Sequence, residues 1–438
     1  MRYKIILSLL AFLNVQVCFS QNLHKEKLDS YFNSLAANNK FMGNILVYQR
    51  GKQLYSFSPG YSNIEKKIKS NKNTSYRIGS ISKTFTATLV LKAVEEGKIT
   101  LNQSIQTFFP SIENADKITI GQLLNHHSGI RNFTGNADFM KWHTQPKNEK
   151  EMTAIIAAGK SSFEPGTKAQ YSNSNYVLLS YLLSHIYQKP YAAILDEKIV
   201  KPLGLKHTQF GDKKDNEETV NSYTYETSWN KTEETHLSIP MGAGGITLTI
   251  KDLNEFVNKL FSGKIISKKM LTEMKTQTDN YGMGLFEMHF DKKTAYSHDG
   301  KIDGYNSIFY YFPAEELTYV LLSNAENYNL NDISTTVLSS VFRLPFEIPI
   351  FNNDKLMPSD LLPHVGLYAS TDSPLIITIS QKDNVLQAQP KGQQLFVMDA
   401  ISNDKFKHYK SGVTLEFTPL TSQMMMKQGN KSLIFTKQ

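Results

Sequence analysis

The chain has 438 residues with a formal net charge of +8 at pH 7, from 48 Lys and Arg against 40 Asp and Glu. The basic residues are scattered in mixed runs such as 66–69, without a basic stripe interleaved with aromatic residues, so composition argues against nucleic-acid binding. Cys18 is the single cysteine, so stability must come from a hydrophobic core rather than from disulfides, and the length suggests two domains.

The first twenty residues have the three regions of a secretory signal peptide. Basic residues precede an apolar run over 5–13, which is too short to span a bilayer, and a short region ends at Ser20. We therefore expect cleavage after Ser20 and an exported protein, periplasmic or secreted. Lipid anchoring at Cys18 is disfavoured because the bulky Val17 precedes it. No later stretch is apolar enough to form an integral membrane segment.

The next elements are a helix, a hairpin and a second helix. A helix is predicted over 25–36, and two β-rich runs, 43–48 and 53–57, flank a turn that contains Gly51. Apolar residues at helical spacing then run from 81 to 94, where Gly97 follows as a helix terminator.

Residues 100–240 are predicted to be mostly helical, with a long polar surface loop over 211–236. The expected helices cover 119–127 and 174–187, and a third begins after Thr249. Strands resume after this region, at 281–290, 294–298, 307–312 and 318–323. Strands at both ends with helices between them predict an α+β fold, in which a returning chain completes one antiparallel sheet around an inserted helical lobe.

A proline-rich stretch separates this part from about eight short β-type runs, which predict a small barrel. The expected domain boundaries are a signal peptide over 1–20, a first domain over 21–345, a linker over 346–360 and a β-barrel domain over 361–438.

Three short motifs carry the candidate chemistry. Ser80 and Lys83 lie three residues apart at the start of a helix, hence on one face, where an amine within reach can activate a serine hydroxyl. Tyr171 and Asn173 lie two apart, so both reach one site only from the turn before a helix. An adjacent lysine ammonium is expected to lower the pKa of the tyrosine, so that it can accept the Ser80 proton.

The third motif, His298-Asp299-Gly300-Lys301, is predicted at the end of a strand. Alternation places His298 and Gly300 on one face, and the glycine would let a substrate backbone approach the strand edge. The backbone N–H groups of Lys301 and Ser80 would form a two-donor oxyanion hole. Each motif taken alone is an ordinary helical turn, helix cap or strand-end turn.

Together, in this order, the motifs resemble the serine β-lactamase and penicillin-recognising hydrolase family. The resemblance covers roughly 41–327 and is closest to the branch with Ser-x-x-Lys, Tyr-x-Asn and His-x-Gly, which includes class C β-lactamases, D-alanyl-D-alanine carboxypeptidases and esterases. It implies a β-lactamase/transpeptidase-like fold, Ser80 as the acylated nucleophile, Lys83 and Tyr171 as acid/base groups, and Asn173 as a substrate-positioning residue. The C-terminal tail is similar to lipocalin-like domains.

The resemblance implies that His298, Asp299, Gly300 and Lys301 line the strand side of the cleft. In the β-lactamases of this family the third motif is usually Lys-Thr-Gly, whose cation and hydroxyl receive a substrate carboxylate. Here Asp299 would repel a carboxylate and His298 would offset it only partly at neutral pH. Esters or peptides without a free carboxylate at that subsite are therefore expected to react better than penicillins.

The expected function is an exported serine hydrolase that forms a Ser80 acyl-enzyme on ester or amide bonds. The alternatives are a D-alanyl-D-alanine carboxypeptidase or β-lactamase, and a non-catalytic protein that binds envelope peptides. No cofactor is expected, and His126 and His127, as sequence neighbours, do not converge on a metal ion. The expected partner is a small-molecule or peptide substrate, with peptidoglycan fragments as one source. The oligomeric state is open.

Overall fold

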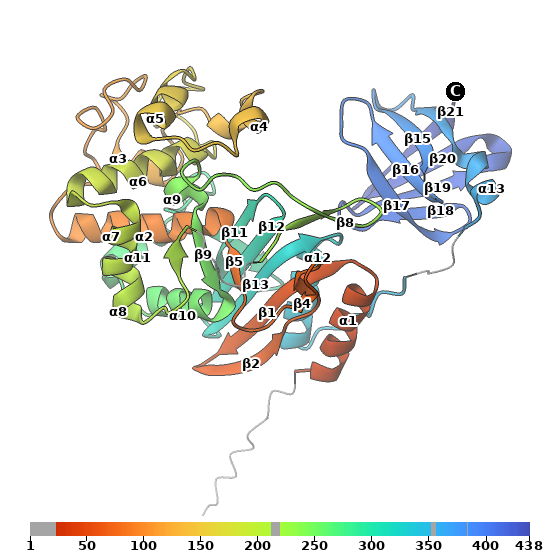
Figure 1. The fold of residues 1–438 in the computed structure, drawn as a ribbon, viewed down its shortest axis with the longest axis horizontal. Helices are drawn as coiled ribbons and strands as arrows, with labels where there is room; N and C mark the ends of the chain where they lie inside the picture. The colour runs from red at the N-terminus through yellow and green to blue at the C-terminus, as the bar shows by residue number, and fades with distance from the viewer. Residues whose placement is uncertain (1–22, 212–219, 352–355, 383) are drawn as a thin grey trace, which may run out of the picture.

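The computed structural model describes residues 23–211, 220–351, 356–382 and 384–438. The predicted signal peptide and Cys18 lie outside the described residues. Figure 1 shows a large mixed domain and a C-terminal barrel beside it. Within the described parts of the chain, no helix is both long enough and apolar enough to span a membrane.

The large domain is built on an antiparallel sheet in which strands from both ends of the domain are neighbours. Ile45 of the N-terminal strand lies opposite Leu321 on one side and Phe57 on the other. The predicted sheet, completed by a returning chain, is thus confirmed. The strands, in the order in which they pair, are β10 (Phe286–Phe290), β11 (Lys293–Ile302), β12 (Tyr305–Phe312), β13 (Leu317–Glu326), β1 (Phe41–Gln49) and β2 (Lys52–Phe57).

The predicted hairpin is formed by β1 and β2, and its turn explains its sequence. Arg50 and Gly51 have positive φ angles of 47° and 77°. Two consecutive residues with positive φ make a type I′ turn, whose twist matches that of the flanking strands.

Helices cover both faces of the sheet. On one face, α1 (Lys25–Ala37) and α12 (Leu330–Val341) pack on the side of Leu321. On the other face, α2 (Ser82–Glu95) and α10 (Ile250–Phe261) pack on the side of Val320. The two neighbouring residues of β13 belong to different hydrophobic clusters because successive side chains of a strand point to opposite faces.

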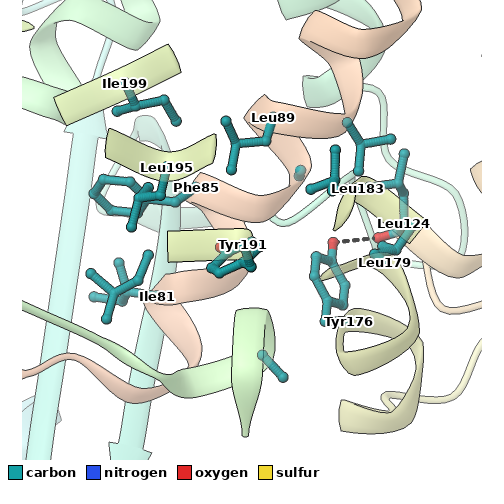
Figure 2. Packing of buried hydrophobic residues seen from close by; sticks show 14 of the residues in the cluster. Ile81, Phe85, Leu89, Leu124, Tyr176, Leu179, Leu183, Tyr191, Leu195 and Ile199 are labelled. Carbon is teal, nitrogen blue, oxygen red and sulfur yellow. Dashed lines mark hydrogen bonds between the residues drawn. The ribbon is translucent and has the colours of Figure 1, made fainter. Parts of the chain in front are cut away.

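The inserted lobe lies beside α2 and is predominantly helical. Its apolar side chains interdigitate with those of α2, and Figure 2 shows the hydroxyl of Tyr176 donating a hydrogen bond of 2.7 Å to the carbonyl oxygen of Leu124. The helical elements are α3 (Ile120–Leu124), η2 (Phe133–Gly135), α4 (Phe139–Trp142), α5 (Glu149–Ala157), α6 (Asn173–Tyr187), α7 (Tyr191–Leu195), η3 (Asp196–Val200) and α8 (Lys201–Leu203); α9 (Met241–Gly244) and α11 (Lys268–Lys275) lie further along the chain.

Two predictions for this region were inaccurate. The helix expected over 119–127 has an N-cap at Thr119 but ends at Leu124, because His126 has a left-handed φ of 63° that a helix does not tolerate. The loop expected over 211–236 lies outside the described residues at 212–219. Beyond that gap it contains a hairpin of β7 (Tyr223–Tyr225) and β8 (Trp229–Lys231).

Two small sheets complete the domain. One consists of β3 (Tyr61–Asn63) and β4 (Ile68–Lys69); the other, in which β9 is central, consists of β5 (Ser75–Arg77), β9 (Ile246–Thr249) and β6 (Gln209–Phe210). Strand β5 runs directly into the one-turn helix η1 (Gly79–Ile81) and then α2. The sheets therefore fix the segment that carries Ser80.

The C-terminal domain is a closed eight-stranded antiparallel barrel, which confirms the predicted barrel. Its interior is filled by side chains such as Leu386, Phe406 and Met424, each at most 1% exposed. Its elements are α13 (Pro358–Leu361), η4 (Leu362–His364), β14 (Gly366–Ala369), β15 (Ile376–Lys382), β16 (Val385–Pro390), β17 (Phe396–Ser402), β18 (Lys405–His408), β19 (Val413–Thr418), η5 (Pro419–Thr421), β20 (Gln423–Gln428) and β21 (Lys431–Lys437).

The barrel contacts the large domain through an aromatic stack and through ion pairs, one of which involves a buried lysine. Lys40, which is 2% exposed, donates to the Asp399 carboxylate at 2.6 Å. The ring of Tyr409, between β18 and β19, stacks on that of Tyr328 with a centroid distance of 5.5 Å. In Figure 1 the β7–β8 hairpin extends toward the same side of the barrel.

A chain of two further ion pairs also links the barrel to the large domain. Lys410 of the barrel pairs with Glu326 at 3.0 Å, and the same carboxylate oxygen lies 3.4 Å from the Nζ of Lys301. This three-residue chain joins the barrel to strand β11.

Candidate active site

Ser80 lies in η1, two residues before the first residue of α2, so the predicted position at a helix start is confirmed. Lys83 is in the first turn of α2 and its side chain is fully buried. Its Nζ is 2.9 Å from the Ser80 hydroxyl oxygen.

Tyr171, which precedes the N-cap of α6, and Asn173, the first residue of that helix, reach Ser80 and Lys83 from the start of α6. The Tyr171 hydroxyl donates to Ser80 Oγ at 2.8 Å, and the Asn173 Oδ1 accepts from Lys83 Nζ at 2.8 Å. Ser172 between them is the extended N-cap residue of α6, so both neighbours face one site, as predicted.

Strand β11 forms the opposite wall, and it is longer than predicted. It continues past His298 to Ile302 because the Gly300 to Ile302 segment stays paired with the start of β12. On its other side β10 pairs only as far as Ser297, which lies opposite Phe286. The third motif therefore lies on a strand whose outer side is not covered by β10.

The structure explains why position 300 is a glycine, and the explanation differs from the predicted approach of a substrate backbone. A Cβ at this position would lie 2.0 Å from the Ile78 carbonyl oxygen and 2.9 Å from the Ser80 nitrogen. A Cβ on Gly79 would likewise lie 2.9 Å from the Lys301 nitrogen. The two glycines thus let η1 approach β11, rather than making room for a substrate, and they bring the backbone nitrogens of Ser80 and Lys301 to one wall.

Burial sets the protonation of Lys83 and Tyr171. Desolvation holds the pKa of Lys83 well below its usual 10.5, although the charge of Asp299 opposes this. Desolvation raises the pKa of Tyr171, and the hydrogen bond to Ser80 offsets this only in part. The expectation that Lys83 would lower the pKa of Tyr171 is therefore wrong, because the free-energy cost of burying the charged phenolate exceeds the stabilisation that neighbouring groups give it.

His298 is a buried neutral side chain in this site. It is 2% exposed, its Nδ1 is 2.6 Å from the Asp299 carbonyl oxygen, and its ring meets the Phe286 ring edge-on at 4.9 Å. Burial and the nearby Lys83 lower its pKa to about 3. It therefore contributes no cation at neutral pH. Asp299, the next residue along β11, is exposed.

One group that shapes the site, a backbone carbonyl, was not singled out from sequence. The Ala243 carbonyl oxygen accepts from Lys83 Nζ at 2.8 Å. The His126 ring lies 4.6 Å from the Tyr171 ring, centroid to centroid, at a tilt of 34°, and its Nδ1 accepts from the Ser172 N–H at 3.2 Å, which gives this histidine a supporting role. A backbone carbonyl has no residue-type signal, so it could not have been found from the sequence.

Two hollows open on either side of β11. The first, of about 370 Å³, is lined by Ser80, Asn173 and the 301–303 segment. The second, of about 420 Å³, is lined by the third motif, 298–301, together with Glu326. In the described residues no group of three or more His, Cys, Asp or Glu side chains could hold a metal ion.

The fold and this constellation define a protein of the serine hydrolase class, in which a lysine and a tyrosine lie within hydrogen-bonding distance of one serine hydroxyl. The family model described as Beta-lactamase matches residues 29–338, so the chain belongs to the beta-lactamase family.

Curated relatives are hydrolases or penicillin-binding proteins. The putative penicillin-binding protein PbpX of Bacillus subtilis is 27% identical over 308 residues, which cover 69% of this chain and 74% of that protein. The teichoic acid D-alanine hydrolase of Staphylococcus aureus is 28% identical over 281 residues, covering 62% and 68%.

Solved structures show the same fold. D-amino acid amidase from Ochrobactrum anthropi matches with a TM-score of 0.65 at 23% identity, over 73% of this chain and 99% of its own. The octameric penicillin-binding protein homologue from Pyrococcus abyssi matches with a TM-score of 0.65 at 21% identity, over 93% and 99%.

Proposed function

We propose that the protein cleaves ester or amide bonds through an acyl-enzyme on Ser80. The observation that carries this proposal is the hydrogen bonding of the Ser80 hydroxyl, which lies 2.9 Å from Lys83 Nζ and 2.8 Å from the Tyr171 hydroxyl. A serine with only a structural role does not require both a buried amine and a buried phenol within hydrogen-bonding distance of its hydroxyl oxygen. A protein that only binds envelope peptides has no need of them either.

Lys83 acts as the general base in this proposal. A neutral lysine has two N–H bonds and one lone pair, and its two carbonyl-type neighbours, Ala243 O and Asn173 Oδ1, can only accept. The lone pair is then left for the hydrogen of Ser80. Because burial lowers the pKa of Lys83, the neutral amine forms at a lower pH than it would for an exposed lysine.

The reaction then follows acyl transfer. The Ser80 oxygen bonds to the substrate carbonyl carbon while Lys83 takes its proton, and the carbonyl oxygen accepts from the backbone N–H groups of Ser80 and Lys301. Tyr171, protonated because its pKa is raised, gives its proton to the leaving oxygen or nitrogen. Water then attacks the ester of Ser80: one proton of the water goes to the Tyr171 phenolate, the acid product leaves, and Lys83 returns its extra proton to the Ser80 oxygen, which restores the enzyme.

The substrate class follows from the third motif and from the relatives. The neutral His298 and the anionic Asp299 provide no cation for a leaving group that carries a carboxylate. The names of the relatives indicate D-alanine and D-amino acid amide hydrolysis in those proteins. For this chain we propose esters or peptide amides without a free carboxylate at that subsite.

The test uses covalent labelling and turnover together. A fluorophosphonate probe is expected to label the wild-type protein at Ser80, and short p-nitrophenyl esters to be turned over faster than nitrocefin. Ser80→Ala should lose both signals, whereas Ser30→Ala, at an exposed serine of α1, should keep them. A wild-type protein without a covalent adduct would favour the binding role instead.

We further propose that the protein is exported, with 1–20 as its signal peptide. The support is the basic start and the apolar run over 5–13. Fractionation of cells that express the full chain or a chain beginning at residue 21 tests it. Retention of both forms in the cytoplasm would count against export.

A further inference from the structure

We propose that the hollow of about 370 Å³ beside Ser80 is the subsite for the acyl group, and that it selects a bulky, uncharged, apolar one. This inference rests on the proposed function and names its substrate class. Neither the resemblance nor the relatives assign the chemistry of this subsite.

The position of the proton donor shows which side takes the acyl group. The atom that leaves must lie next to the group that protonates it, and that group is Tyr171. The hollow includes Ser80 and the backbone of Gly79 and Lys301 in its wall, but Tyr171 and His298 do not line it. A carbonyl carbon held at Ser80 therefore directs its leaving group toward Tyr171 and His298 and its acyl group into this hollow.

The wall of the hollow is apolar over most of its area. Its apolar side chains come from three separate segments, the η2–α4 region, the turn before α9 and the end of β11. They are Phe133, Phe139, Met140, Ile239, Pro240 and Ile302. Phe139 meets Phe133 at a centroid distance of 6.0 Å, so an aromatic wall is already in place before an acyl group enters.

Two polar side chains of the wall, those of Asp303 and Asn173, already have partners, and the Nδ1 of His143, also in the wall, lies 3.0 Å from the Met140 carbonyl oxygen. The Asp303 carboxylate accepts from the N–H and the hydroxyl of Thr235 and lies 3.4 Å from the Arg77 guanidinium. The Asn173 Nδ2 donates to the Thr134 hydroxyl at 3.3 Å. A positive charge on the acyl group would have to compete with Arg77 for Asp303 while giving up its own water.

A chromogenic ester series with one leaving group tests this inference. For p-nitrophenyl acetate, butyrate, hexanoate and phenylacetate, kcat/KM should rise by roughly threefold to fourfold for each buried methylene, and at least tenfold from acetate to hexanoate and to phenylacetate. The 3-phenylpropanoyl ester should exceed both the D- and L-phenylalanyl esters, which add an ammonium to the same shape.

A rim variant separates this pocket from general hydrophobicity. Met140 is 70% exposed at the rim, so Met140→Glu should fold normally and reduce the hexanoate-to-acetate ratio of kcat/KM severalfold. Met357→Glu, at a methionine that is 64% exposed and does not line the hollow, should leave that ratio unchanged.

The outcomes distinguish the two proposals. Turnover of all esters at similar kcat/KM, or a preference of tenfold or more for a phenylalanyl ester, would overturn the apolar subsite and leave the Ser80 mechanism standing. The same holds if Met140→Glu leaves the chain-length ratio intact. Absence of both turnover and fluorophosphonate labelling would overturn the proposed function, and this inference with it.

Discussion

Asp299 is the residue of the third motif whose charge bears most directly on substrate choice. Its side chain is exposed beside the hollow of about 420 Å³, and its charge acts to raise the pKa values of Lys83 and Tyr171. It therefore lies close enough to the site to act on a charged substrate.

Asp299→Thr is expected to raise kcat/KM severalfold for a D-alanyl-D-alanine peptide, since one like charge is removed near the leaving carboxylate. The same peptide with an amidated C-terminus serves as the control and should change little. Equal rates for mutant and wild type on the acid would mean that the Asp299 side chain does not face the leaving group.

His298 should make the folded state sensitive to acid. Its pKa is about 3 when folded against an ordinary value of 6.5, so between these values the unfolded chain holds a proton that the folded chain does not. Stability must then fall as the pH is lowered from 6.5 toward 3, by up to about 1.4 kcal/mol per pH unit from this residue.

Urea unfolding of wild type and His298→Gln across this pH range measures that contribution. The variant is expected to show a shallower slope, by nearly one proton, while His24→Gln at an exposed position should keep the wild-type slope. Identical slopes in all three proteins would show that His298 is protonated at its ordinary pKa.

At the scale of elements, the contact between η1 and β11 is the joint that sets the site. It depends on the absence of a side chain at Gly300, where a Cβ would collide with the Ile78 carbonyl oxygen. Backbone rather than a flexible side chain stands in the way, so η1 would have to move as a unit.

Gly300→Ala is therefore expected to destabilise the protein by roughly 1–3 kcal/mol and to reduce turnover more than substrate affinity, because the Ser80 N–H moves away from the oxyanion. Thermal unfolding and steady-state kinetics measure the two effects. Gly135→Ala, with nothing within 4 Å of its added Cβ, should leave both near wild type. A fully active Gly300→Ala protein would contradict the role of this joint.

Much of the fold was predictable because its local signals agree with its tertiary contacts. The β1–β2 hairpin follows from Gly51 in its turn, and α2 follows from apolar spacing that ends before Gly97. The meeting of Ser80, Lys83, Tyr171 and Asn173 was also predicted, from their motifs taken together.

What could not be predicted depends on burial and on distant backbone. The direction of the Tyr171 pKa required knowing how completely the phenol is desolvated, and the reason for Gly300 required knowing that the Ile78 carbonyl packs on it. The β7–β8 hairpin was not predicted because polar residues flank Trp229 and because the two strands pair over only three residues.

At the scale of the whole molecule, ion pairs as well as the polypeptide connection hold the barrel to the large domain. The Asp399 carboxylate accepts a hydrogen bond from Lys40. Burial lowers the pKa of Lys40, and the negative charge of Asp399 opposes that effect. Removing the carboxylate would leave a lysine that is 2% exposed without its anion.

Asp399→Ala is expected to loosen the barrel and to speed cleavage of the predicted linker, 346–360, by a nonspecific protease, because a lone buried cation costs several kcal/mol. Timed proteolysis and small-angle scattering measure the release. Asp372→Ala, on an exposed barrel residue, should behave as wild type. Unchanged cleavage and scattering would show that the aromatic stack of Tyr409 and the Lys410–Glu326 ion pair suffice for attachment.

The Lys410–Glu326–Lys301 chain means that the catalytic domain cannot be trimmed without altering it. A truncated protein that ends before the barrel would lack the Lys410 cation, so the Glu326 carboxylate would keep only Lys301, whose backbone N–H is a proposed oxyanion donor, as its partner in this chain. Kinetic constants from such a fragment would describe a different entrance from that of the full chain.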